Sequence, residues 1–325
     1  MELTSAEVEQ KRRDLLDAIP TLARHRDAIF LPMGDMISRF QASEPRKNAK
    51  LDGIFDFIRS RWNEKEYSLL QERHLSIEGL QDILKMNLRS PEQKYLDLPF
   101  WIKGKFGVAK TLDLESRQGS KLLDIGAGPG HFGLICKYYG VDYLGLEIPL
   151  THWVSSVEQH LFDDLCRYFG IRRKTLKVTA GVPISLGERF DILTCLMGNF
   201  SAFESRLANV PVDESVAWPW PVWAAFLSDA VDNVMVEKEF EIYMQVGREY
   251  FSRISADIGR YAYYVDEKRC VFRINQTVDK IGLRKDALAG RRLVARRRLA
   301  RIATNLLRRV SRFWRQLNLM TPKTP

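Results

Sequence analysis

The stretch LLDIGAGPGHFG, from Leu122 to Gly133, places four glycines within eight residues directly after an apolar run. The run from Lys121 to Ile125 is typical of a buried strand, and Phe132 to Tyr139 has the pattern of a helix. Glycines at such a turn let a ligand approach the backbone, and they aim free N–H groups and a helix dipole at negative charge. The stretch therefore predicts a nucleotide-like ligand at the carboxyl end of a strand.

From Gly119 onward the chain alternates short apolar runs with helical segments, which is typical of a βαβ architecture. The runs YAYYV and RCVFRIN are separated only by Asp266–Lys268, too short for a helical crossover, so they must form an antiparallel hairpin. We therefore predict an α/β fold in which five strands with helical crossovers precede a terminal hairpin. The five strands are expected at residues 121–125, 141–148, 175–180, 190–198 and 240–246.

The glycine loop by itself fits two kinds of ligand. Gly128–Gly133 satisfies G-x-G-x-x-G, the dinucleotide fingerprint, which would indicate a flavin or nicotinamide enzyme. Three features oppose this interpretation. Asp124 stands near the end of the strand where dinucleotide folds keep an apolar residue, about 115 helical residues precede the motif, and the terminal hairpin is foreign to the usual dinucleotide sheet.

The same residues resemble another family. LLDIGAGPGHFG followed by LGLEIP (Leu144–Pro149) is similar to motifs I and II of class I S-adenosylmethionine (SAM)-dependent methyltransferases, and the order of elements agrees from about Gly119 to Asn275. The resemblance implies a Rossmann-like, mostly parallel seven-stranded sheet and S-adenosyl-L-methionine as cofactor. It implies that Glu147 accepts hydrogen bonds from both ribose hydroxyls. It also implies that the methionine part is held by the loop residues Asp124, Gly126, Gly128 and Gly130.

The remaining expected cofactor contacts are apolar. Val182 stands where many members of the family place an acid that reads adenine, so adenine is expected to be held by apolar packing and backbone groups. The expected cofactor-binding set also includes Ile148, which follows the ribose-binding Glu147, and Leu196, near the end of the fourth strand.

The candidate catalytic residues are His131 and Asn199. Methyl transfer is an in-line displacement, and a hydroxyl acceptor needs a group that removes its proton. His131 in the glycine loop is the candidate base, with His152 as a second, and Asn199 after the fourth strand is the candidate to orient the acceptor. A loop or cap role without chemistry is the alternative for both histidines. No metal is predicted, because Asp232–Asn233, which is similar to a magnesium-binding pair, falls inside an amphipathic helix.

The expected acceptor is a sugar hydroxyl. Trp218, Trp220 and Trp223 lie near the expected acceptor side, and aromatic faces stack on sugar rings, although tryptophans also commonly fill cores. This Trp-rich stretch and the strand after it are similar to bacterial methyltransferases of surface-polysaccharide biosynthesis, which implies O-methylation of a glycan or glycolipid precursor. Met197–Phe200 does not match the signature of base-amino methyltransferases, which disfavours a nucleobase. An RNA (tRNA or rRNA) methyltransferase and a non-catalytic SAM-binding scaffold are the alternatives.

The net charge of +9 belongs to the end of the chain. Residues 284–325 hold 13 Lys/Arg and one acid, a balance of +12, so the first 283 residues carry 9 − 12 = −3. Apolar residues recur every three or four positions from Leu299 to Met320, with arginines beside them. The pattern predicts a basic amphipathic helix whose residues 284–320 bind an anionic membrane surface. RNA, the body of the protein or a second subunit are the alternative partners, and the acidic body makes nucleic acid the weaker one.

Three parts are therefore expected: a helical N-terminal region (1–115), a methyltransferase domain (116–278) and the basic tail (279–325). The four cysteines form no C-x-x-C pair, and we find no secretory signal and no spanning run of about 18 apolar residues. A cytoplasmic protein, peripheral at the inner face of the cell membrane, is expected. The aromatic stretch Tyr95–Leu114 is expected either to cover the ligand site or to pack against the sheet.

Overall fold

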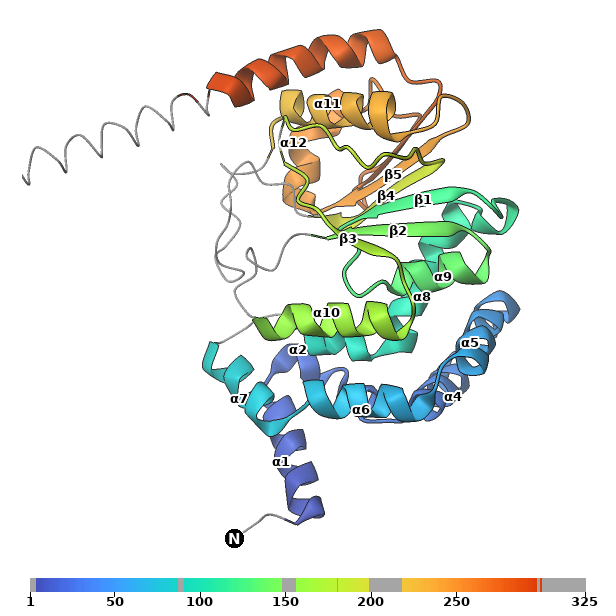
Figure 1. Ribbon diagram of the computed structural model, residues 1–325, viewed down its shortest axis with the longest axis vertical. Helices are drawn as coiled ribbons and strands as arrows, with labels where there is room; N and C mark the ends of the chain where they lie inside the picture. The colour runs from blue at the N-terminus through green and yellow to red at the C-terminus, as the bar shows by residue number, and fades with distance from the viewer. Residues whose placement is uncertain are drawn as a thin grey trace, which may run out of the picture.

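The computed structural model describes residues 4–86, 91–147, 156–179, 181–198, 218–296 and 299. At its centre lies a seven-stranded sheet with the order β3-β2-β1-β4-β5-β7-β6 (Figure 1). The first five strands pair in parallel, and β7 pairs antiparallel with both β5 and β6. The predicted Rossmann-like sheet with a terminal hairpin is therefore confirmed. The strands are β1 (Lys121–Ile125), β2 (Asp142–Glu147), β3 (Arg173–Thr175), β4 (Ile192–Gly198), β5 (Glu241–Val246), β6 (Tyr264–Asp266) and β7 (Val271–Asn275).

The third strand differs from its prediction. It covers Arg173–Thr175 instead of residues 175–180, and it pairs only with β2. The last register pair joins Glu147 to Thr175, after which the Leu176 N–H donates to the Glu147 carbonyl at 2.8 Å. Beyond this point β2 has ended, so the apolar run that suggested a longer strand has no described strand to pair with.

The two faces of the sheet carry separate cores. Successive side chains of a strand point to opposite faces, so Leu122 and Ile192 join one apolar cluster while Leu123 and Leu193 join the other. In Figure 1, α11 and α12 lie above the sheet, and α8, α9 and α10 lie below it. These helices are α8 (Leu98–Thr111), α9 (His131–Tyr138), α10 (Ser156–Tyr168), α11 (Trp220–Asp229), continued by a π-helical turn at Ala230–Val234, and α12 (Arg248–Ile258).

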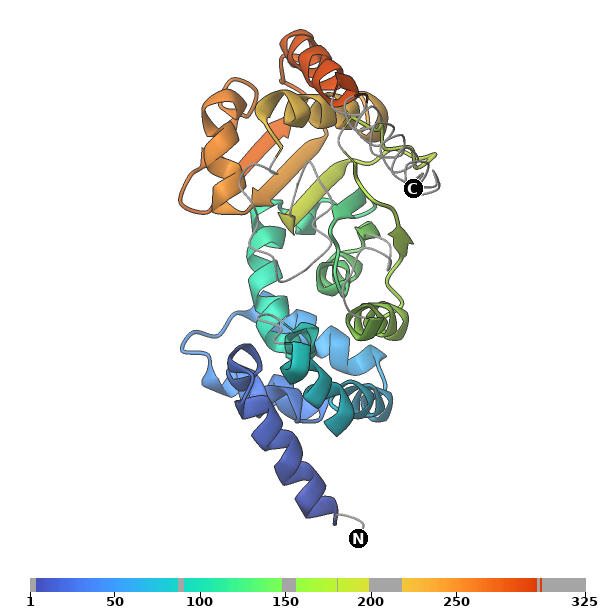
Figure 2. The ribbon, with the colours of Figure 1, turned by 90° about the vertical axis from the view of Figure 1, so that its left-hand side faces the viewer.

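In the described part of the N-terminal region all secondary structure is helical, and the region lies below the sheet in Figures 1 and 2. Its last helix, α8, begins at the cap residue Asp97, has Pro99 in its first turn, and continues through Gly104. Contacts with both α4 and α9 place it between the region and the sheet. The other elements are α1 (Ser5–Asp17), α2 (Pro20–Ala23), α3 (Arg26–Ile29), α4 (Met33–Ser43), α5 (Ala49–Arg61), α6 (Glu64–His74), α7 (Ile77–Met86), η1 (Glu92–Leu96) and η2 (Leu114–Ser116).

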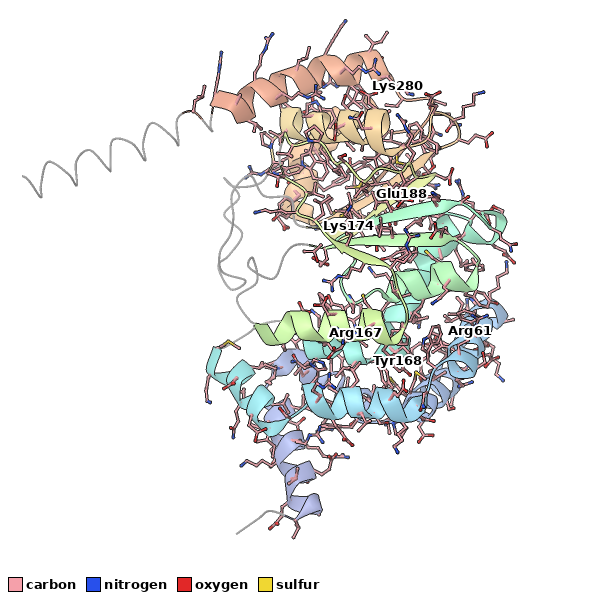
Figure 3. The ribbon with its side chains drawn as sticks, in the orientation of Figure 1. Arg61, Arg167, Tyr168, Lys174, Glu188 and Lys280 are labelled. Atoms are coloured by element: carbon pink, nitrogen blue, oxygen red, sulfur yellow. The ribbon has the colours of Figure 1, made fainter. Side chains whose placement is uncertain are left out.

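The helical region and the lower face of the sheet share one core. The Tyr168 hydroxyl at the end of α10 donates to the Asn63 carbonyl at 2.8 Å, at the side of α10 that faces α6 in Figure 3. Asp164 on the same helix accepts from both Arg73 and His74 at 2.9 Å. The apolar cluster beneath the sheet is continuous with that of the helices.

Residues 280–296 form a helix that packs on α11 at the top of Figure 1. The closest approach is at Gly290, where a Cβ atom would lie 1.7 Å from the carbonyl oxygen of Pro221. An ion pair fixes the start of the helix, because Arg284 donates to both oxygens of Asp232 at 2.8 and 3.0 Å. No helix in the described part of the chain is long and apolar enough to cross a bilayer.

Candidate functional site

The glycine loop lies where the chain order of the sheet switches direction. The chain runs outward from β1 to β3 and then returns to pair β4 with β1, and open α/β sheets bind ligands at this point. Gly126, Gly128 and Gly130 all have left-handed backbones, with φ of 73°, 55° and 78°. A Cβ at Gly130 would also lie only 3.0 Å from Ile171, whereas one at Gly126 would meet nothing within 4 Å. The loop therefore needs glycine, and at Gly126 it faces open space.

Glu147 lies against this loop. It is the last residue of β2, only 6% exposed, and its Oε2 accepts a hydrogen bond from the Gly128 N–H at 2.8 Å. The structure thus brings together the two motifs that the sequence places 19 residues apart. A carboxylate beside open backbone N–H groups can accept hydrogen bonds from a ligand's hydroxyls while the loop contacts the rest of the ligand.

Asp124 lies beneath the loop with both oxygens engaged. Its Oδ1 accepts from the Thr194 hydroxyl at 2.8 Å and its Oδ2 from the Tyr143 hydroxyl at 2.9 Å. Burial raises the pKa of this carboxyl. The two bonds tie β1 to β4 and β2, so Asp124 fixes the strand ends from which the loop departs.

His131 is the first residue of α9, and its ring is buried, with 2% of the residue exposed. Its Nε2 has no hydrogen-bond partner among the described residues. Burial, together with the positive charge of Lys105, lowers the pKa of His131 to about 3, although the backbone carbonyl of Tyr95 opposes the shift. The imidazole is therefore neutral at physiological pH.

Lys105 is a candidate site residue that the sequence reasoning missed. It projects from α8, is half-buried, and its charge acts on Asp124, His131 and Cys195, so its ammonium lies near the ends of β1 and β4. Burial lowers the pKa of this ammonium. The sequence pattern could have identified this lysine, because positions 102, 105, 106 and 109 share one face of the helix. Three of them hold buried apolar residues and the fourth holds a lysine.

The remaining predicted residues are dispersed or lie outside the described part of the chain. Val182, predicted to pack on adenine, is 44% exposed in the loop after β3. Leu196 is buried on β4 opposite Gln245. Ile148, Asn199 and the alternative base His152 fall outside the described residues.

The tryptophans do not form an acceptor surface. Trp218 and Trp223 are buried against Phe226, in the core above the sheet. Trp220 stacks on Tyr261, and its Nε1 donates to Asp286 at 2.8 Å. The expectation that these rings stack on a sugar is wrong, because all three are buried in the core above the sheet.

The acid–amide pair in the same part of the fold is also structural. Asp232 is held by Arg284, and the Asn233 amide donates to Asp229 at 2.6 Å. Among the described residues, no group of three or more His, Cys, Asp or Glu side chains could hold a metal ion.

No protein-family model and no curated protein matches this sequence. Among solved structures, the chain is similar to a SAM-bound amino pentose methyltransferase from Micromonospora echinaspora involved in calicheamicin biosynthesis, with 17% identity and a TM-score of 0.30. That match covers 45% of this chain and 51% of the other.

Two further solved structures are similar to this chain at comparably low identity and TM-score. A sugar N-methyltransferase from a Streptoalloteichus species is 14% identical, with a TM-score of 0.29 and coverage of 44% and 47%. A protein from Pyrococcus horikoshii is 13% identical, with a TM-score of 0.32 and coverage of 57% and 80%. The chain spans about half the length of the two sugar methyltransferases. At these values the likeness carries nothing about chemistry.

Proposed function

We propose that this protein binds SAM and transfers its methyl group to a sugar hydroxyl of a glycan or glycolipid precursor. The observation that carries the cofactor assignment is the contact of Glu147 with Gly128 at the switch point of the sheet. A dinucleotide would also place an acid here, but its usual sheet has the order 3-2-1-4-5-6. In this sheet an antiparallel β7 is inserted between β5 and β6, which opposes the dinucleotide alternative.

Three features of the site fit the cofactor. Open space at Gly126 gives a ligand access to the backbone of the loop. The unpartnered Nε2 of His131 is a buried polar atom of the kind that a bound ligand satisfies. The Lys105 ammonium would hold the anionic end of the methionine part, and Glu147 would hold the ribose hydroxyls.

The chemistry needs little from the protein besides alignment. SAM, when bound, would supply a methyl group whose carbon an acceptor oxygen attacks in line, with S-adenosylhomocysteine leaving as a neutral thioether. His131, with a pKa of about 3, is a poor base at neutral pH. We assign it the role of orienting the acceptor oxygen by accepting a hydrogen bond from its hydroxyl. Once that oxygen bonds to the methyl carbon it would become strongly acidic, and its proton would leave to water. Asp124 keeps the strand ends in place through Thr194 and Tyr143.

Methyl transfer can be tested with methyl-tritiated SAM and separated cell fractions. Incubation of the full chain with lipid-linked glycan, sugar-nucleotide and RNA fractions should place the label in one of the two sugar fractions. Label found in RNA would support the tRNA or rRNA alternative and overturn the acceptor assignment. Binding of the cofactor without transfer to any fraction would support the non-catalytic scaffold.

We infer that the tail attaches the protein to an anionic membrane surface. On the docked helix, Ile281 and Leu288 are exposed on one face, and Leu299 further along the chain is exposed as well. Arginines flank this face, and residues 297–325 contain eight Lys/Arg and no acid. Each basic residue near an anionic surface contributes about 1 kcal/mol to attachment.

Removing residues 297–325 tests this attachment while keeping the helix that packs on α11. The full chain should float with vesicles that contain phosphatidylglycerol and not with purely zwitterionic vesicles. The shortened chain should lose flotation. Equal flotation of both chains with anionic vesicles would contradict the role of the tail.

A further inference from the structure

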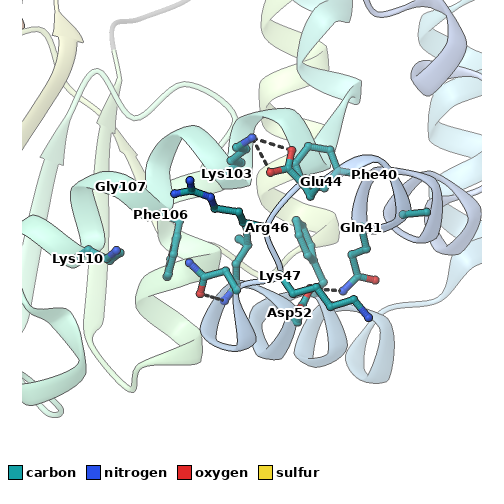
Figure 4. Close-up of a pocket in the computed structure, with 14 residues that line it drawn as sticks. Phe40, Gln41, Glu44, Arg46, Lys47, Asp52, Lys103, Phe106, Gly107 and Lys110 are labelled. Carbon is teal, nitrogen blue, oxygen red and sulfur yellow. Dashed lines mark hydrogen bonds and ion pairs between the residues drawn. The ribbon is translucent and has the colours of Figure 1, made fainter.

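The N-terminal helical region contains a cavity that is separate from the glycine loop. It measures about 500 Å³, within the size range of small-molecule sites. It opens between the segment joining α4 to α5 and the side of α8 that carries Lys103, Gly107 and Lys110 (Figure 4). Lys105, whose charge acts at the cofactor site, is not among its lining residues.

The cavity is positively charged. Four cations line it, against the two acids Glu44 and Asp52. Both acids are engaged, since Glu44 accepts from Lys103 at 2.6 and 2.8 Å and Asp52 accepts from the Gln41 amide at 2.6 Å. Three cations have no carboxylate partner among the described residues, and these are Arg46, Lys47 and Lys110.

This charge is local to the cavity. The first 283 residues carry a net charge of −3, so the surplus of cations does not reflect a generally basic body. Figure 4 shows the Arg46 side chain reaching across the opening toward Phe106 and Gly107. Lys110 lies over the Phe106 ring, 5.9 Å from its centroid. The cations therefore surround an opening in the surface.

The wall behind the cations is apolar. Phe40, Leu51, Phe55 and Phe106 form it, with the Phe40 and Phe55 rings packed edge to face at 5.6 Å. Gly107 leaves a gap in this wall, because a Cβ at this position would meet nothing within 4 Å. The ligand that suits such a cavity has a compact body with apolar C–H faces and carries negative charge.

We propose that this cavity binds an anionic sugar, one that bears a phosphate or a carboxylate. The guanidinium of Arg46 matches the two oxygens of either group, and Lys110 adds a second charge. The C–H face of the ring lies against Phe40 and Phe106. Because the lining residues belong to the helical region, this site can be occupied whether or not the glycine loop holds its cofactor.

Calorimetry on the full chain tests the proposal with four probes: glucose 1-phosphate, glucuronate, inorganic phosphate and glucose. At least one anionic sugar should bind, at least tenfold more tightly than both inorganic phosphate and glucose. The tighter of the two anionic sugars identifies the anionic group. Absence of binding by both, or equal affinity for inorganic phosphate and the anionic sugars, would overturn the proposal.

Two variants separate this site from general surface charge. Gly107→Leu fills the gap with a good helix former and should abolish binding, and Arg46→Gln should weaken it about tenfold. Gly104→Leu is the matched control, since Gly104 is also on α8 with nothing within 4 Å but does not line the cavity. Binding that survives Gly107→Leu, or that Gly104→Leu removes equally, would contradict the assignment. Affinity for S-adenosylhomocysteine should be unchanged in both glycine variants.

Discussion

A buried carboxyl, a buried imidazole and a half-buried ammonium meet where β1 runs into the glycine loop. Asp124 is satisfied by two hydroxyls, whereas Nε2 of His131 has no hydrogen-bond partner in the described part of the chain, and burial lowers the pKa of the Lys105 ammonium. Burying a polar atom without a partner costs free energy, so the unpartnered Nε2 at this place indicates a ligand that completes it.

Replacing Lys105 by methionine should separate binding from folding. The variant keeps the length of the side chain but removes the charge, so affinity for S-adenosylhomocysteine should fall at least tenfold. The thermal midpoint should stay within a few degrees, because the Lys105 ammonium forms no ion pair with the residues that the structure describes. Lys110→Met, on the same helix but at the cavity, is the control. Unchanged affinity in Lys105→Met would remove this residue from the site.

The pKa of His131 predicts a pH dependence of stability. The folded protein holds this pKa at about 3, against 6.5 for an unperturbed histidine, so only the unfolded chain takes up the proton between these values. The contribution of the neutral His131 to the free energy of unfolding is fully present above pH 6.5. It falls as the pH drops toward 3, by about 2 kcal/mol at pH 5. Urea unfolding at pH 7 and pH 5 should show that His131→Gln loses about 2 kcal/mol less than the wild type. Equal losses would contradict the neutral imidazole.

At the scale of elements, β1, β2, β4, β5 and the hairpin were predictable because their apolar runs are bounded by turns. Residues 175–180 were misplaced, since strand pairing depends on where β2 ends and a local pattern does not contain that information. The tryptophan expectation was wrong for a related reason. Their position in the chain suggests that Trp218 and Trp223 lie near the expected acceptor side, but both pack into the core above the sheet.

The docking of helix 280–296 depends on Gly290. Gly290→Ala places a methyl group at the carbonyl of Pro221, so the helix must move and stability should fall by about 1–3 kcal/mol. Gly104→Ala, in a helix with open space, should instead raise stability by up to about 1 kcal/mol. Urea unfolding of both variants checks the pair. A neutral Gly290→Ala would show that this helix does not pack on α11 as described.

At the scale of the molecule, the helical region and the lower face of the sheet form one unit, because they share one core. The sequence indicated a helical region before residue 116, yet its contacts with the sheet could not be predicted, because they join residues as distant as Asn63 and Tyr168. The same holds for the site. The motifs identify the loop and Glu147, while Lys105 becomes a site residue only once α8 is placed on the sheet.

A shared core predicts cooperative unfolding. The described residues up to 116 and those of the sheet should unfold in a single calorimetric transition, with agreement between calorimetric and van't Hoff enthalpies. A chain that begins at residue 117 should be insoluble or unfolded, because removal of the helices exposes Phe132, Leu134 and Ile135. Two separate transitions, or a folded shortened chain, would contradict the single unit.

The most direct test of the account is calorimetric titration with S-adenosylhomocysteine. Wild type should bind one equivalent, and Glu147→Ala should weaken binding by at least tenfold, through loss of the charge-assisted hydrogen bonds to the ribose. The control is Glu188→Gln. Glu188 belongs to neither motif and its carboxylate is ion-paired with Lys121, so this variant should bind as wild type does. Equal affinity in all three proteins, or binding of NAD in place of S-adenosylhomocysteine, would contradict the assignment of the glycine loop.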